Sequence, residues 1–119
     1  MGTGYVLGKY AMTLITHGLA GELKDDGIAC NTLWPRTAIQ TAAVQNLLGG
    51  DSTMSGSRTT AIMADSAYVI LTAKSTATTD NFFLDDEVLI SSGMNVTDLK
   101  KYSPNPNAPD SALVPDFMC

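Results

Sequence analysis

The sequence is poor in the residues that bind metal ions and form disulfide frameworks. Its 119 residues include two cysteines and one histidine. Cys30 lies inside an apolar run and Cys119 is the last residue, so the pair has neither a metal-binding spacing nor the pattern of a disulfide framework. His17 has no second histidine or clustered acids beside it. We therefore expect no metal site.

Positive charge is also scarce. Seven Lys and Arg residues against twelve Asp and Glu residues give a net charge of −5 and a pI near 4.4. A nucleic-acid site needs clustered basic residues to neutralise phosphates, so this balance argues against nucleic acid as a partner. No apolar run approaches the roughly 20 residues that span a bilayer, and the N-terminus lacks the pattern of a signal peptide. We expect a soluble, intracellular protein, with cytoplasm, mitochondrion and peroxisome left open.

The sequence does contain enough apolar residues for the core of one domain. It is 45% hydrophobic and 16% charged, which is typical of a globular chain. Apolar side chains recur at steps of three and four residues over 5–24, and this spacing predicts a long helix. They cover more than one stripe of that helix. We therefore expect burial on two sides, by the body of the domain and by another helix or another subunit.

The rest of the chain predicts an α/β fold. Residues 28–34 form a short apolar run typical of a buried strand, 58–73 predict a second helix, and 82–84 predict a strand parallel to the first. The second helix is expected to cross between the two strands. The three acids at 85–87 are interpreted as a solvated turn rather than a metal site. Prolines and weak periodicity predict an extended tail over 91–119.

Tyr5 and Lys9 stand four residues apart at the start of the first predicted helix, so they share one helix face. An ammonium beside a phenol stabilises the phenolate, which makes Tyr5 a candidate general acid and base. A packed tyrosine with a solvated lysine is the alternative interpretation of this spacing. The pair resembles the Tyr-x-x-x-Lys motif of the short-chain dehydrogenase/reductase family, which opens a long helix in the same way.

The segment after the first predicted strand strengthens this resemblance. Three residues match the family's Asn-x-x-x-Pro-Gly-x-x-x-Thr pattern: Asn31, Pro35 and Thr41. Arg36 replaces the glycine, as is typical of the family's hydroxysteroid dehydrogenase-like subgroup. Residues 81–87 and the ending at 114–118 are similar to the same subgroup. The resemblance implies the C-terminal half of a Rossmann-like, doubly wound parallel sheet, here helix-strand-helix-strand followed by the extended tail.

The resemblance also implies an NAD- or NADP-dependent oxidoreductase that acts on a small-molecule carbonyl or alcohol. Tyr5 would exchange a proton with the substrate oxygen, and Lys9 would support the phenolate and bind the nicotinamide ribose. The implied cofactor-binding residues are Lys9, Pro35, Thr37, Ile39 and Thr41. The stretch 42–57 would be the substrate-binding loop, in which three apolar residues would line a pocket: Leu47, Leu48 and Met54. A surface connection is an equally good interpretation of that stretch from the residues alone.

The family's glycine-rich dinucleotide-binding segment and its catalytic serine have no counterpart in the sequence. Residues 2–8 contain three glycines, but no strand precedes them. We therefore expect 1–119 to be a single partial domain that is catalytically incomplete alone, with substrate and cofactor preference left open. The family's helix interfaces imply a homo-oligomer through helix 5–24. The alternatives are a non-catalytic interaction module or truncated paralogue that docks through helix 5–24, and a fragment without a stable fold.

Overall fold

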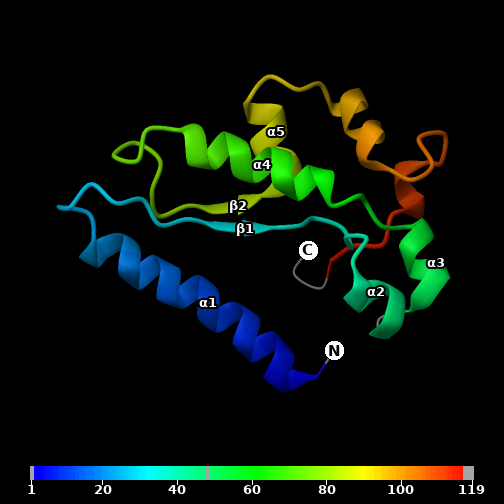
Figure 1. Ribbon diagram of the computed structural model, residues 1–119, viewed down its shortest axis with the longest axis horizontal. Coiled ribbons are helices and arrows are strands. Elements are labelled where there is room, and N and C mark those ends of the chain that lie inside the picture. Colours follow the sequence, from blue (N-terminus) through cyan, green and yellow to red (C-terminus); the bar gives the residue numbers. More distant parts are fainter. Residues whose placement is uncertain (1, 48, 117–119) are drawn as a thin grey trace.

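The computed structural model describes residues 2–47 and 49–116, and it places helices on both sides of a small parallel sheet (Figure 1). Helix α1 lies on one side of the strands, and α4 and α5 lie on the other. None of the helices within this described part has the length and apolar character needed to cross a membrane. The elements in chain order are α1 (Thr3–Glu22), β1 (Thr32–Trp34), α2 (Ala42–Leu47), α3 (Gly50–Ser55), α4 (Ala61–Thr72), β2 (Phe82–Leu84), α5 (Asp85–Ser91), and the 3₁₀ helices η1 (Val96–Tyr102) and η2 (Asp110–Ala112).

Strands β1 and β2 pair in parallel, in a register that places Trp34 beside Leu84. The predicted parallel pairing and the helix that crosses between the strands are confirmed. Strand β1 is shorter than the predicted 28–34. At its start the Oδ1 atom of Asn31 accepts hydrogen bonds from the backbone and side-chain amides of Asn81, at 3.1 and 2.9 Å. The Thr32 amide donates to the Asn81 carbonyl at 3.0 Å, so these side-chain bonds add to the backbone bonds at this end of the sheet.

The two long helices form close to where the apolar spacing predicts them. Helix α1 begins and ends two residues earlier than predicted, and α4 begins three residues later. The late start of α4 has a physical cause. The backbone amide of Arg58 donates to the carbonyl of Ala38 at 2.9 Å, and that of Thr59 donates to the carbonyl of Tyr102 at 2.7 Å. The Arg58 carbonyl in turn accepts the backbone amide of Gln40 at 2.8 Å, so it is not available to close a first helical turn at this residue.

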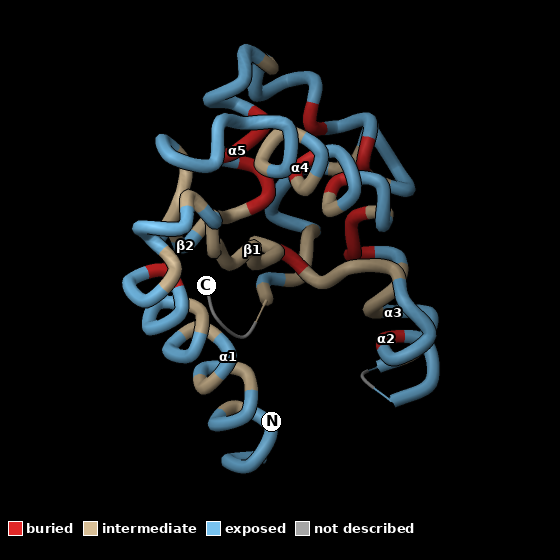
Figure 2. The backbone as a smooth tube through the Cα atoms, turned by 60° about the vertical axis from the view of Figure 1, so that its left-hand side comes forward, coloured by how far each residue is buried: buried red, intermediate tan, exposed pale blue. Residues whose placement is uncertain are grey.

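The core lies between α4, α5 and η1, on one side of the sheet, where Figure 2 shows buried segments gathering. It is an apolar cluster of four buried residues: Ile62, Leu89, Leu99 and Tyr102. Two hydrogen bonds complete it. The Tyr102 hydroxyl donates to Asp65 Oδ2 at 2.5 Å, and the Ser66 hydroxyl donates to the Asp85 carbonyl at 2.8 Å. These two buried hydroxyl groups are thus paired, as is usual for polar groups inside a core.

Helix α1 is covered on one side only. Among its residues Ala20 is buried, whereas Leu7, Leu14 and Ile15 are each more than 60% exposed. Figure 2 shows the helix as mostly exposed along its length. The second covering side that the sequence predicts for helix 5–24 is therefore not supplied by residues 2–47 and 49–116.

The three acids after β2 do not form the solvated turn predicted from sequence. They open helix α5, and Asp85 and Asp86 are buried. Asp85 Oδ1 accepts hydrogen bonds from the backbone amides of Arg36 and Asp86, at 3.0 and 2.8 Å. The prediction failed because the partner that buries these acids, Arg36, is about fifty residues away in sequence and is invisible to a local pattern.

The chain after residue 91 is less extended than predicted. It contains η1 and η2, and two η1 residues, Leu99 and Tyr102, belong to the core. Its later part lies beside the segment that follows β1. The backbone amide of Asp116 donates to the Arg36 carbonyl at 3.0 Å, and that of Ala38 donates to the Val114 carbonyl at 2.8 Å. The segment therefore forms part of the folded body.

Candidate functional site

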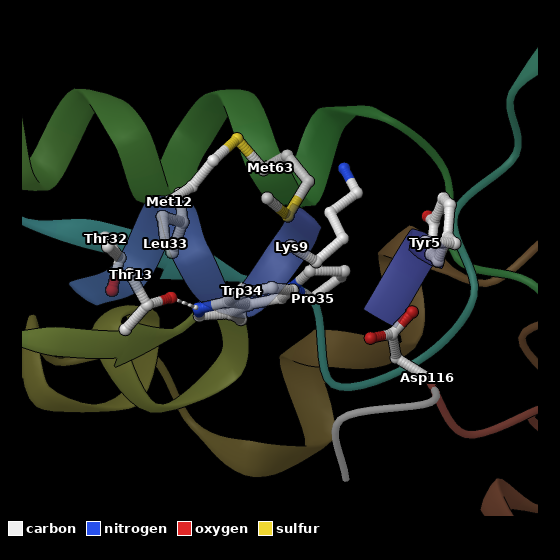
Figure 3. Close-up of a pocket in the computed structure, with 10 residues that line it drawn as sticks. All are labelled: Tyr5, Lys9, Met12, Thr13, Thr32, Leu33, Trp34, Pro35, Met63 and Asp116. Atoms are coloured by element: carbon white, nitrogen blue, oxygen red, sulfur yellow. Dashed lines mark hydrogen bonds between the residues drawn. The ribbon is translucent and has the colours of Figure 1, made fainter. Parts of the chain in front are cut away.

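A cavity of about 360 Å³ lies between α1 and the carboxyl end of β1 (Figure 3). We call it the Tyr5–Lys9 cavity; its ten lining residues come from α1, β1 and the residue after it, α4 and the C-terminal segment. The carboxyl end of parallel strands is where open α/β sheets bind ligands. The volume lies in the range of small-molecule sites. The position and size of this cavity therefore make it the candidate functional site.

Tyr5 and Lys9 enter the cavity from one face of α1, as their four-residue spacing predicts. The Lys9 Nζ atom lies 5.6 Å from the centroid of the Tyr5 ring. Figure 3 shows the amine and the phenol at the same end of the cavity. Within the described residues, no carboxylate lies within 4.0 Å of this ammonium. The lysine charge is therefore available to the phenol and to a bound ligand.

Trp34 forms an apolar wall of the cavity at the end of β1. Its Nε1 atom donates a hydrogen bond to Thr13 Oγ1 at 3.2 Å, and its ring centroid lies 6.4 Å from that of Tyr10. Both partners belong to α1. These contacts fix the distance between the helix that carries Tyr5 and the strand that ends at Trp34.

Sequence reasoning missed seven of the ten residues that line this cavity, among them Trp34, Met63 and Asp116. The sequence does contain a signal that could have indicated Trp34, because this aromatic residue stands at the end of a predicted strand, directly before Pro35. Asp116 belongs to the ending that resembles the dehydrogenase subgroup, of which 117–119 lie outside the described residues. Nothing in the local sequence indicates that Met63 lines the cavity, because its position depends on how α4 packs across the sheet.

Of the residues predicted to hold the cofactor, Lys9 and Pro35 line the cavity, whereas Thr37, Ile39 and Thr41 do not. The latter three lie in the segment that leaves β1. Thr37 is buried in a bridge to the C-terminal segment, and Ile39 forms a parallel bridge and packs against the core. Thr41 Oγ1 accepts the backbone N–H of the third residue along, at 3.3 Å. Their predicted binding roles stay predictions.

The residues predicted to bind substrate lie on the two short helices beyond this segment. Leu47 in α2 is 80% exposed, Met54 in α3 is half-buried, and Leu48 lies outside the described residues. Figure 1 shows α2 and α3 side by side at one end of the molecule. Neither Leu47 nor Met54 lines the Tyr5–Lys9 cavity. Their substrate role also stays a prediction.

Arg36 anchors the loop that carries Pro35 into the cavity wall. Its Nε atom donates to Asp86 Oδ2 and its Nη2 atom to Glu87 Oε1, each at 2.5 Å. The bond to Asp86 is the largest cause that raises the pKa of Arg36. Burial raises the pKa of Asp85, which accepts the Arg36 backbone amide. Arg36 has no positive φ, so this network forms without a glycine-like backbone at that position.

The arrangement is suited to proton exchange with a small polar ligand. A phenol and an ammonium border one end of an otherwise largely apolar cavity, whose walls include tryptophan and methionine side chains. The site therefore offers a proton donor and acceptor held beside a fixed positive charge.

Comparisons with known proteins place this fold among dehydrogenases. The chain is 50% identical to a short chain dehydrogenase of Mycobacterium thermoresistibile, whose crystal structure it matches with a TM-score of 0.81 over 97% of this chain and 39% of that one. A solved structure from Xanthomonas campestris matches with a TM-score of 0.85 and 43% identity, over 98% of this chain and 40% of that one. The α/β fold is thus that of a part of these proteins.

The curated relatives of the chain also include dehydrogenase-like proteins. The chain is 43% identical over 114 residues to hydroxysteroid dehydrogenase-like protein 2 of Xenopus tropicalis, which covers 96% of this chain and 25% of that protein. No protein-family model matches the chain. The chain therefore spans about a quarter of the length of the curated relatives it matches, and about two fifths of the solved ones.

Proposed function

We propose that this chain, a relative of the short-chain dehydrogenases/reductases over nearly its whole length, supplies the proton-transfer residues of an NAD- or NADP-dependent oxidoreductase. Its substrate is a small carbonyl compound or alcohol. The observation that carries the proposal is the Tyr5–Lys9 pair, with 5.6 Å between Nζ and the ring centroid, inside a cavity at the carboxyl end of β1. The identity to dehydrogenases over nearly the whole chain supports it.

Alcohol oxidation removes a hydride from the carbon and a proton from the oxygen. The Tyr5 hydroxyl oxygen accepts that proton from the substrate in the oxidising direction and donates it in the reducing direction. Lys9 holds its positive charge beside the phenol and so stabilises the phenolate. When bound, the nicotinamide ring accepts or supplies the hydride.

The residues of the cavity fit the nicotinamide end of such a cofactor. The Lys9 ammonium provides donors for ribose hydroxyls, and its charge is not taken up by a carboxylate within the described residues. Trp34 and Pro35 provide a flat apolar surface for a ring. The rest of the dinucleotide is proposed to need the part of a short-chain dehydrogenase that this chain does not cover, so the chain alone is catalytically incomplete.

The direct test is substitution of Tyr5 in the dehydrogenase that contains this chain. Tyr5→Phe keeps the ring and its packing but removes the oxygen that exchanges the proton. We expect turnover with NAD or NADP to fall by at least about a hundredfold, with an unchanged melting temperature. Tyr68→Phe, at a position 70% exposed on α4, is the control and is expected to keep full turnover. Turnover retained in Tyr5→Phe contradicts the proposal.

A second candidate function is docking through α1 onto a second copy of the chain. Its support is the exposed apolar side chains of this helix, since Leu7, Leu14 and Ile15 are each more than 60% exposed among the residues that the structure describes. The helix also has no acidic residue in its first turn and no basic residue in its last. A homo-oligomer would bury this face. A chain that associates through α1 and never binds a nicotinamide cofactor would be an interaction module instead of part of an enzyme.

A further inference from the structure

Asp85 is a buried acid that the proposed proton transfer does not use, although it stands near the Tyr5–Lys9 cavity. It is 0% exposed and directly follows β2. In the register of the sheet it comes level with Pro35, the residue after β1, which lines that cavity. The acid is therefore placed at the carboxyl end of the sheet, one strand away from the cavity wall.

The Asp85 side chain holds the backbone of the loop that leaves β1. Its Oδ1 atom accepts the backbone N–H of Arg36 at 3.0 Å and that of Asp86 at 2.8 Å. The first bond crosses from the end of β2 to the end of β1, whereas the second stays within α5. Because Arg36 directly follows Pro35, the first bond fixes the peptide next to a residue of the cavity wall.

The same bond reaches the C-terminal segment through Arg36. The Arg36 carbonyl accepts the backbone N–H of Asp116 at 3.0 Å, and Asp116 lines the cavity. Figure 3 shows Asp116 at the end of the cavity where Tyr5 lies. One buried carboxylate thus holds, through a single residue, two parts of the cavity wall that are far apart in the sequence.

The Arg36 side chain has anchors of its own, but they act less directly on the wall. Its guanidinium donates to Asp86 and Glu87, and the side chain is 38% exposed. Several rotatable bonds separate that guanidinium from the backbone. The bond to Asp85 acts on the backbone amide itself and comes from a group shielded from water. We therefore expect this bond to determine where the loop stands.

Stability alone does not account for an acid at this place. The second oxygen of Asp85, Oδ2, has no hydrogen-bond partner within the described residues. Burial is the largest cause that raises the pKa of this group, so the ionised form is disfavoured in the folded chain. A buried carboxylate with one unpaired oxygen costs stability. What the residue contributes in return is the bond that Oδ1 makes across the sheet.

We propose that Asp85 is a positioning residue of this cavity: its Oδ1 atom holds the Arg36 backbone and thereby sets the positions of Pro35 and Asp116 in the wall. The acceptor oxygen, and not the negative charge, carries this role, because both bonds come from neutral backbone amides. The consequence for nicotinamide binding rests on the proposed function, in which Pro35 supports the ring.

Two variants with the same branched shape separate the acceptor oxygen from the charge. Asp85→Asn keeps Oδ1 without the charge, and Asp85→Leu removes both. Amide hydrogen exchange in the 119-residue chain measures how firmly the wall is held. We expect the amides of Arg36 and Asp116 to exchange at least about tenfold faster in Asp85→Leu than in Asp85→Asn. If Asp85→Leu does not fold, Asp85→Ala, which removes the same oxygen without adding bulk, takes its place.

Tyr102→Phe is the matched control, because it also removes one buried hydrogen bond, but from the core. A general loss of stability speeds the exchange of all protected amides together. We therefore expect Tyr102→Phe to speed the exchange of the Asp116 amide no more than that of the Thr59 amide, which is bonded elsewhere. In Asp85→Leu the Asp116 amide should be affected more.

Calorimetric titration with NADH measures the consequence for binding. We expect Asp85→Leu to raise the dissociation constant about fivefold, because the wall is no longer preorganised, and Asp85→Asn and Tyr102→Phe to leave it as in the original chain. Any of three results overturns the inference: equal exchange of the Asp116 amide in Asp85→Leu and Asp85→Asn, equal NADH binding by these two variants, or the same weakening of NADH binding in Tyr102→Phe. If the original chain binds no NADH, the proposed function fails instead, and the exchange of the Asp116 amide alone decides whether Asp85 positions the wall.

Discussion

Trp34 in β1 donates a hydrogen bond from Nε1 to Thr13 Oγ1 in α1 over 3.2 Å, along the wall of the Tyr5–Lys9 cavity. The rest of the described structure covers helix α1 only in part, since Ala20 is the residue of this helix that is buried. This bond therefore links the helix that carries Tyr5 and Lys9 to the strand that ends at the cavity.

Thr13→Val tests that link. Valine keeps the shape of the side chain but removes the acceptor, so the indole N–H loses its partner inside the fold. We expect the free energy of unfolding in urea to fall by about 1 kcal/mol. Thr16→Val is the control, because the Thr16 hydroxyl bonds only the carbonyl of Met12 in its own helix and is exposed. Equal losses in the two variants would show that the bond across the cavity contributes nothing specific.

The buried hydroxyl of Tyr102 leads to a second prediction. The hydroxyl donates a hydrogen bond to Asp65 Oδ2 at 2.5 Å, and Tyr102 itself is only 2% exposed. Tyr102→Phe removes this bond from the core and should lower the free energy of unfolding by about 1 kcal/mol. Tyr68→Phe, at an exposed position, should leave it unchanged.

The same residue should make stability depend on alkaline pH. Burial, and then the neighbouring Asp65, raise the pKa of Tyr102 above its ordinary value of 10.0. The folded chain thus holds the phenolic proton more tightly than the unfolded chain does. Its contribution to stability is complete below pH 10.0 and is lost as the pH rises further. The stability difference between the original chain and Tyr102→Phe should therefore shrink above that pH in urea titrations, and a constant difference contradicts this assignment.

Asp85 leads to a third prediction, at acidic pH. Burial is the largest cause that raises its pKa above the ordinary 3.8, so the protonated form is favoured in the folded chain. Its contribution to stability is complete below pH 3.8 and is lost as the pH rises through the raised value. Asp85→Asn keeps an oxygen for the amides of Arg36 and Asp86 but cannot ionise. The stability of Asp85→Asn relative to the original chain should therefore increase from acidic to neutral pH, as measured by urea unfolding.

The exposed face of α1 leads to a fourth prediction. If a second copy covers this face, Leu14→Glu should shift the chain from dimer to monomer in sedimentation equilibrium, because it places a charge in an apolar interface. Leu71→Glu is the control, since Leu71 is 82% exposed on α4. A chain that is monomeric without any substitution, or that dimerises equally in both variants, would exclude α1 as the contact.

Local patterns in the sequence were sufficient for the two long helices, for the pair of parallel strands and for the shared helix face of Tyr5 and Lys9. The spacing of apolar residues in 5–24 predicted α1, and the same periodicity placed Tyr5 and Lys9 on one face of it. The parallel pairing of Phe82–Leu84 with β1 followed from the run of β-branched and aromatic residues and the handedness of crossovers.

What the sequence did not reveal depends on partners far apart in the chain. The acids Asp85 and Asp86 looked solvated because their partner Arg36 is about fifty residues away. The C-terminal segment looked extended because its anchors, Leu99 and Tyr102, stabilise η1 only through contacts with α4 and α5. Asp116 reaches the cavity for a similar reason, through a backbone bond to Arg36. No local pattern carries this information.

The most direct test of the proposed cofactor site is a titration of the chain with NADH and NADPH. Binding is monitored by fluorescence energy transfer from Trp34 to the reduced nicotinamide. Trp34 is the sole tryptophan and lines the Tyr5–Lys9 cavity, so it reports binding there. We predict saturable transfer with a dissociation constant of about 1 mM, weakened about tenfold in Lys9→Gln and unchanged in Lys24→Gln, which alters an exposed lysine beyond α1. Absence of transfer, or equal binding in the two lysine variants, would contradict the claim that Lys9, Trp34 and Pro35 hold the nicotinamide end of the cofactor.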